Sequence, residues 1–154
     1  IQNYLKSSLY LIWGYTYGPP MAVAPIDKVR EVLDYAVTEI PRYKIYMGVP
    51  NYGYDWTLPY RRGESRARVI GNVEAVDLAV RNRADILYDE TAQSPHFTYI
   101  SDGVQHEVWF EDVRSMKKKY ETSAEYQFYG IGYWNLMRPF RANWLLLHHL
   151  VNQT

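Results

Sequence analysis

Aromatic residues follow three short apolar segments of this sequence, and side chains of this type at such positions can bind carbohydrate. Tyrosine and tryptophan combine a flat apolar face with a hydrogen-bonding group, which suits stacking against a sugar ring. The sequence holds 16 Tyr and 5 Trp but only 4 Phe. The candidate substrate-binding residues are Trp134, Tyr52, Tyr54, Trp56 and Trp13.

Trp134 ends the apolar segment "GIGYW". Residues two apart share one face of a strand, so Gly130, Gly132 and Trp134 point the same way, and the two glycines leave room beneath a large ring. In a closed parallel barrel, Trp134 would lie at the C-terminal end of its strand, where such barrels bind ligands. It would then form a flat floor for a sugar. The alternative is that the indole fills core space above small neighbours.

The segment "PNYGYDWTLPY", residues 50–60, holds more rings than a turn requires. We expect a loop in which Tyr52, Tyr54 and Trp56 form the walls of a cleft, because loops at strand ends carry function. The alternative is that these rings pack beneath a neighbouring insertion. Trp13 follows another apolar segment and repeats the arrangement.

Apolar periodicity predicts the elements that position these rings. A stripe with a 3.6-residue period predicts a helix over 26–40, and a buried strand is expected over 44–50. A second helix is predicted within 111–127 and a second strand over 129–134, before a final helix over 142–151. Helices that alternate with buried strands are typical of an α/β protein.

The pattern changes between these two helix–strand pairs. Asn72 is a candidate N-cap for a helix, and two apolar runs flank the turn residues 101–103, which is typical of a hairpin. A helix and a hairpin at this place predict a small α+β insertion. The expected divisions are a barrel segment over 1–58, an α+β insertion domain over 59–110 and a barrel segment over 111–154.

Charge and composition exclude several classes of function. Lys+Arg and Asp+Glu both number 17, so no overall field attracts nucleic acid or an anionic membrane. We expect the lysine run at 117–119 to be a solvated helix face, and Glu111 with Asp112 to open that helix. No apolar stretch has the length of a membrane span. No cysteine is present, the four histidines lack metal-ligand spacing, and no cofactor motif occurs, so neither metal nor cofactor is expected.

Four phrases of the sequence together resemble the C-terminal half of glycoside hydrolase family 18: "WGYTYGPP", "MGVPNYGYDW", "VWFEDVRS" and "GIGYWNL". The resemblance covers residues 13–151 and is strongest to chitinase-like N-acetylglucosaminidases of the spore cortex and peptidoglycan. It implies a TIM (β/α)8 barrel, of which this chain supplies about strands six to eight. The insertion would then lie between strand seven and its helix.

The resemblance also implies a chemistry. Family 18 enzymes use the acetamide oxygen of the substrate as the nucleophile, while one glutamic acid protonates the leaving oxygen. That acid belongs to a D-x-x-D-x-D-x-E motif on strand four, which this sequence lacks. The segment "DILYDE", with Asp85, Asp89 and Glu90, has a different spacing and falls in the insertion. No catalytic residue is therefore assigned.

The positions that match the family pattern are aromatic ones. Trp134 matches the tryptophan that floors the subsite of the cleaved sugar, and Tyr52 matches the tyrosine of a Y-G phrase. Tyr54 stands where many chitinases have arginine. The family's methionine, tyrosine and acidic residue on strand six are replaced here by Leu9, Leu11 and Ile12.

The expected function is therefore that of the C-terminal portion of a glycosidase for β-1,4-linked N-acetylglucosamine polymers, either peptidoglycan or chitin, and inactive by itself. Its expected partners are the polysaccharide and the N-terminal half of the barrel, with no nucleic acid and no membrane span. The resemblance implies a spore, cell-envelope or extracellular location. The alternative is a carbohydrate-binding or interaction module without catalysis.

Overall fold

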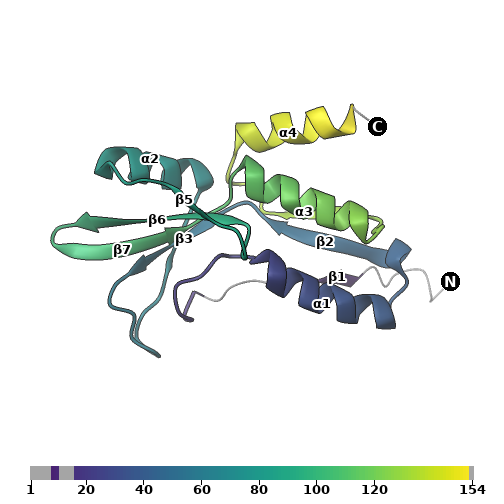
Figure 1. Ribbon diagram of the computed structural model, residues 1–154, viewed down its shortest axis with the longest axis horizontal. Helices are drawn as coiled ribbons and strands as arrows, with labels where there is room; N and C mark the ends of the chain where they lie inside the picture. Colours follow the sequence, from purple (N-terminus) through teal and green to yellow (C-terminus); the bar gives the residue numbers. More distant parts are fainter. Residues whose placement is uncertain (1–7, 11–15, 153–154) are drawn as a thin grey trace.

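The chain forms two sheets of opposite type (Figure 1). The computed structural model describes the backbone of residues 8–10 and all of residues 16–152. A three-stranded parallel sheet has the order β1-β2-β8, and a five-stranded antiparallel sheet has the order β4-β3-β7-β6-β5. In Figure 1 the parallel sheet lies to the right with helices α1, α3 and α4, and the antiparallel sheet lies to the left with α2.

The bounds of these elements follow the predicted rhythm of helix and strand. The strands are β1 (Ser8–Tyr10), β2 (Ile45–Pro50), β3 (Gly53–Thr57), β4 (Arg68–Ile70), β5 (Leu87–Asp89), β6 (Ser94–Ser101), β7 (Val104–Trp109) and β8 (Gly130–Trp134). The helices are α1 (Ile26–Glu39), α2 (Asn72–Asn82), α3 (Val113–Glu125) and α4 (Arg141–Val151), with a 3-10 turn at Arg42–Lys44.

The outer face of the parallel sheet is covered by helices. Met47 of β2 packs with the buried stripe of α1, and Val49 packs with Met116 and Tyr120 of α3. Helix α1 ends before Pro41, which cannot continue it. Because Met47 and Val49 face the helices, the residues that alternate with them lie on the opposite face of the sheet. That second face carries Tyr46 and Trp134.

Helix α3 begins with a complete capping box. The Asp112 carboxylate accepts the backbone N–H groups of Arg114 and Ser115, while the Ser115 hydroxyl accepts the N–H of Asp112. The expectation that acidic residues open this helix is confirmed for Asp112. The expectation of a solvated lysine run over 117–119 is wrong for Lys119, which is fully buried.

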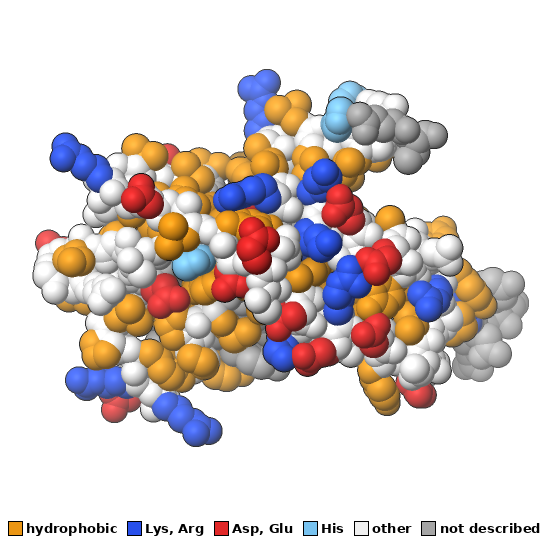
Figure 2. Space-filling model, in the orientation of Figure 1, with side chains coloured by type: hydrophobic (Ala, Val, Ile, Leu, Met, Phe, Trp, Pro, Cys, Tyr) orange, Lys and Arg blue, Asp and Glu red, His pale blue; other side chains and the backbone are white. Residues whose placement is uncertain are grey.

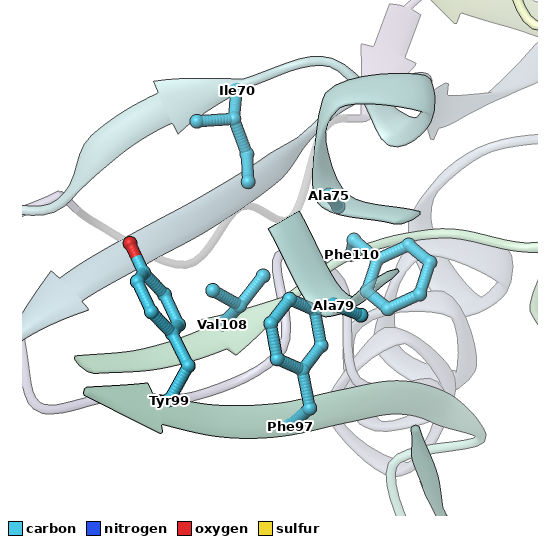
Figure 3. Close-up of a cluster of buried hydrophobic side chains, with 7 residues drawn as sticks. All are labelled: Ile70, Ala75, Ala79, Phe97, Tyr99, Val108 and Phe110. Carbon is cyan, nitrogen blue, oxygen red and sulfur yellow. The ribbon is translucent and has the colours of Figure 1, made fainter. Parts of the chain in front are cut away.

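The insertion has its own hydrophobic core between α2 and one face of the antiparallel sheet (Figure 3). Phe97, Tyr99 and Val108 from the central strands meet Ala75 and Ala79 of the helix. The predicted hairpin is confirmed as β6 and β7, which pair from Ser101 and Val104 outward. Its two turn residues, Asp102 and Gly103, both have positive φ (51° and 75°), as a two-residue hairpin turn requires.

Two boundaries differ from those expected. Strand β3 pairs with β4 and β7, so the insertion begins at Gly53 and not at residue 59. Helix α2 begins at Asn72, with Gly71 as its N-cap, because the Asn72 side chain is used elsewhere. Local patterns cannot separate a strand from a ring-rich loop when both are short.

Charges of both signs are mixed over the surface. Figure 2 shows Lys and Arg side chains alternating with Asp and Glu across the face that carries α1 and α3. Arg30 of α1, for example, forms a two-pronged hydrogen-bonded pair with Glu125 of α3. Among the described residues, no helix has both the length and the apolar character needed to cross a membrane.

Candidate functional site

Trp134 is the last residue of β8 and is 49% exposed. Strand β8 runs parallel to β2, and Trp134 is the register partner of Pro50 at the C-terminal end of both strands. The indole therefore lies at the end of a parallel sheet, on the face that the helices leave uncovered. The role of Trp134 as a substrate floor stays a prediction.

The glycines of β8 make room for a different ring from the one expected. A Cβ atom placed on Gly130 would lie 3.3 Å from Cε1 of Tyr46, its register partner on β2. The space above Gly130 is thus occupied by the Tyr46 phenol ring, which also contacts Tyr129 at a centroid distance of 5.0 Å. The small size of Gly130 therefore accommodates the Tyr46 ring.

Asn51 holds the segment that follows Trp134. Its backbone N–H donates to the carbonyl of Trp134 at 2.9 Å, which extends the β2–β8 ladder by one residue. Its side-chain amide donates to the carbonyl of Arg138 at 2.6 Å. Asn51 is 1% exposed, so these bonds are shielded from water. The sequence contained no signal for this role beyond an asparagine at a strand end.

The rings that were expected to form cleft walls pack inside the molecule. Tyr52, Tyr54 and Trp56 are 5%, 4% and 0% exposed, and successive rings meet edge to face at centroid distances of 5.6 and 6.2 Å. Tyr60 continues the row beyond Trp56. These residues belong to β3 and its flanks and not to a loop, and they form a buried cluster with Val23 and Ala67. Additional chain can only bury them further.

The burial of these rings controls the ionisation of the phenols. Desolvation raises the pKa of Tyr52 and of Tyr54 above the usual tyrosine range, because burial penalises the charged form. Both phenols are therefore neutral hydrogen-bonding groups at neutral pH. Trp13, the remaining aromatic candidate, lies outside the described residues.

The insertion contains a buried carboxylate that sequence reasoning missed. Asp55 of β3 accepts hydrogen bonds from the Tyr99 hydroxyl at 2.9 Å and Arg68 at 3.0 Å, and it contacts His106 Nδ1 at 2.9 Å. Burial, followed by the bond to Asp55, raises the pKa of Tyr99 to about 12. Alternation along β3 was the available signal, since it places Asp55 on the face opposite Tyr54 and Trp56. With its acceptors satisfied, this carboxylate organises the insertion core.

A second buried carboxylate joins the insertion to α3. Glu111 and Lys119 are both 0% exposed, and Nζ lies 2.9 Å from Oε2. Burial raises the pKa of Glu111, and the charge of Lys119 opposes that rise. The pair lies under the junction of β7 and α3, so its role is structural.

The acidic residues of "DILYDE" are turn and surface groups. The Asp89 carboxylate accepts the backbone N–H groups of Thr91 and Ala92, while Asp85 and Glu90 are exposed. Within the described part of the chain, no group of three or more His, Asp or Glu residues could hold a metal ion.

Known proteins that resemble the chain point to one family. The family description "Glycosyl hydrolases family 18" matches residues 11–138. The chain is 50% identical over 141 residues to the "Cortical fragment-lytic enzyme" of Bacillus subtilis (strain 168), which covers 91% of this chain and 33% of that protein.

Solved structures agree with this match. The Bacillus cereus spore cortex-lytic enzyme SleL superimposes with a TM-score of 0.85 at 49% identity, over 88% of this chain and 32% of that one. The chitinase from Chromobacterium violaceum ATCC 12472 superimposes with a TM-score of 0.80 at 30% identity, over 93% of this chain and 45% of that one. The chain thus spans about a third of the length of the cortex-lytic relatives that it matches. The family match, the sequence identity and the superposed folds together establish that this chain belongs to glycosyl hydrolases family 18.

Proposed function

We propose that this chain is the C-terminal portion of a glycosidase that cleaves β-1,4-linked N-acetylglucosamine polymers. In this proposal it supplies the substrate floor through Trp134 and an α+β insertion domain, while the catalytic acid comes from another part of the barrel. The observation that carries the proposal is the half-exposed indole of Trp134 at the C-terminal end of a parallel strand. The C-terminal ends of barrel strands are where such enzymes bind their substrates.

The two sheet edges and the uncovered face support a barrel as the complete fold. Among the described residues, β1 and β8 each pair only with β2, which leaves both outer strands with an open edge. Parallel sheets are stable when both faces are covered, and a barrel removes the edges altogether. We assign the strands to positions six to eight of a TIM barrel, and the partner of the chain is the remainder of that barrel.

Peptidoglycan of the spore cortex is the preferred substrate over chitin. The similar proteins with the higher identity are named for spore cortex, at about half of the residues identical, whereas the chitinase match has 30% identity. The location that follows is the spore or cell envelope. Tyr54 in place of a chitinase arginine points the same way, although its buried ring acts on the cleft through packing and not through direct contact.

Among the aromatic residues, the roles in this proposal follow exposure. Trp134 offers a half-exposed ring to a sugar, whereas Tyr52 and Trp56 act as packed support within a buried cluster. Tyr52 is 5% exposed, so its ring offers little surface for a direct contact. Trp13 keeps its proposed place in the cleft on sequence grounds alone.

The floor is tested by tryptophan fluorescence. Titration of the chain with N-acetylglucosamine oligomers is expected to change the emission, and Trp134→Ala is expected to abolish the response and weaken binding about fivefold or more, since a stacked aromatic contributes on the order of 1 kcal/mol or more. Trp144→Phe is the matched control, because Trp144 of α4 contacts Tyr133 on the outer face of β8. An unchanged titration in Trp134→Ala would remove the floor assignment.

The competing function is a carbohydrate-binding or interaction module without catalysis. The observation in its favour is that Trp134 is exposed, whereas no acidic residue among the described ones is assigned a catalytic role. A search for hydrolysis by a complete barrel containing this segment separates the two. Binding without turnover in the complete protein supports the module, and release of N-acetylglucosamine supports the glycosidase.

A further inference from the structure

A series of hydrogen bonds between buried amide groups connects residues 134–138 to the insertion domain. It begins at Asn51, which immediately follows β2 and has both of its amide functions in use. The Asn51 backbone holds the carbonyl of Trp134, and its Nδ2 holds the carbonyl of Arg138, with a longer contact of 3.5 Å to the carbonyl of Asn135. Asn51 thus forms hydrogen bonds with both ends of the segment 134–138.

The second link is Asn72, the first residue of α2 in the insertion. Its Nδ2 donates to Oδ1 of Asn51 at 3.3 Å, and its Oδ1 accepts the backbone N–H of Glu111 at 3.0 Å. Asn72 is 2% exposed, so it is enclosed almost as completely as Asn51. Glu111 in turn forms the buried ion pair with Lys119 of α3, so the hydrogen-bonded series extends to that helix.

The chemistry of the two positions requires amides. Each side chain must donate at one end and accept at the other while remaining uncharged, and asparagine does this with a short, stiff side chain. A carboxylate at 51 would face the carbonyl oxygen of Arg138, and an aliphatic side chain would leave buried carbonyl groups without donors. Unpaired buried polar groups are costly, so the arrangement is strongly specified.

We propose that Asn51 and Asn72 are positioning residues for Trp134, which lock the indole-bearing segment to the insertion domain so that floor and insertion keep one relative placement. The sugar-binding consequence rests on the proposed function, whereas the locking itself does not. Neither asparagine is proposed to touch substrate. Loss of the link between them frees the segment 134–138 while the core of the insertion remains packed.

The test substitutes Asn72→Asp. This change keeps an oxygen acceptor for the Glu111 N–H but removes the donor to Asn51. It therefore breaks one hydrogen bond, the one between Asn72 and Asn51. We expect faster amide hydrogen exchange in peptides covering residues 134–139 and an affinity for N-acetylglucosamine tetramer that is lower by about tenfold, the effect of losing one buried hydrogen bond. Asn82→Asp is the matched control, because Asn82 lies at the other end of α2, exposed and bonded to the Leu78 carbonyl.

A second variant keeps the proposal testable if Asn72→Asp loses its circular dichroism signal. Asn51→Ser introduces no charge, leaves the backbone bond to Trp134 and removes the donor to Arg138, so it is expected to give the same local increase in exchange. A folded variant whose amide exchange rate over 134–139 equals that of the wild type would overturn the proposal. If the wild type binds the tetramer, faster exchange in a variant with unchanged tetramer affinity would overturn it as well. Faster exchange in a protein whose wild type does not bind tetramer supports the locking and counts against the proposed function instead.

Discussion

At the scale of single residues, exposure separates aromatic side chains that the sequence presents as equivalent. Trp134 and Trp56 both lie at or after strand ends in ring-rich segments, yet one is 49% exposed and the other is fully buried. The difference arises because the pleat directs Trp134 to the face that the helices leave open, whereas Trp56 turns toward Tyr54 and Tyr60. Of these two rings, only that of Trp134 is exposed to solvent.

The buried pair of Glu111 and Lys119 gives a prediction at this scale. Lys119→Met leaves Glu111 as a buried carboxylate without its cation, and such losses typically cost about 3–5 kcal/mol of unfolding free energy at neutral pH. Lys117→Met on the same helix is the control, since Lys117 is exposed and its pair with Glu121 contributes less than about 1 kcal/mol. Urea unfolding of the two variants measures the difference.

The pH dependence of that variant follows from the sign of the pKa shift. Burial raises the pKa of Glu111 in the folded state, and removal of Lys119 raises it further, so the folded protein binds this proton more tightly than the unfolded chain does. The deficit of Lys119→Met is therefore expected to shrink as the pH falls through the folded-state pKa, and to be smallest below about 4.3, the unfolded value. A deficit that grows on acidification would contradict this account.

At the scale of elements, the junction between the two sheets depends on a close backbone approach. A Cβ atom on Gly53 would lie 2.6 Å from the carbonyl oxygen of Trp109 and 2.7 Å from Cβ of Phe110. These atoms belong to the backbone or are fixed to it, so they cannot move aside as a flexible side chain would. The insertion therefore starts at a glycine because β3 and the end of β7 pass in direct contact.

This contact predicts that Gly53→Ala destabilises the chain by roughly 1–3 kcal/mol or more, as overpacking does in a tight core. Gly71→Ala is the matched control: its φ of −77° suits any residue, and the nearest neighbour of its added Cβ would be Nη1 of Arg138 at 3.9 Å. Thermal or urea unfolding of both variants checks the expectation. Equal stability of the two would mean that the strands separate without cost.

At the scale of the whole molecule, the described residues form two parts that differ in how fully their sheets are covered. The insertion encloses its own core between α2 and the antiparallel sheet (Figure 3). Among the described residues, helices pack on one face of the parallel sheet, while no described element covers its other face or pairs with its two outer edges. The antiparallel part therefore encloses a core, whereas the parallel part is an open three-stranded sheet among the described residues.

We predict from this contrast that the 154-residue chain alone releases no N-acetylglucosamine from cortex peptidoglycan or chitin oligomers. Refolding it together with the complementary N-terminal part of the Bacillus subtilis cortical fragment-lytic enzyme is expected to produce release, because the identity of 50% lets the open edges find matching strands. The chain with Trp134→Ala serves as the control in the same mixture. Hydrolysis by the isolated chain would contradict the prediction.

Much of the local structure follows from the sequence by short-range physics. The periodic stripe of α1, the hairpin turn at Asp102 and Gly103 and the strand that ends in Trp134 were all predicted, because each depends on residues a few positions apart. The family was also identified from its motifs. Membership is confirmed by the match over residues 11–138.

Other features were decided only by the tertiary structure. Lys119 sits in a lysine run that reads as surface, and its burial depends on Glu111, which reaches it from the end of the insertion. Asn51 and Asn72 are separated by 21 residues and meet because two sheets pack at one junction. Local pattern determines which elements form, since periodicity acts within one helix or strand. Which polar groups are buried, and which aromatic ring stays exposed to solvent, depends on contacts between elements distant in sequence.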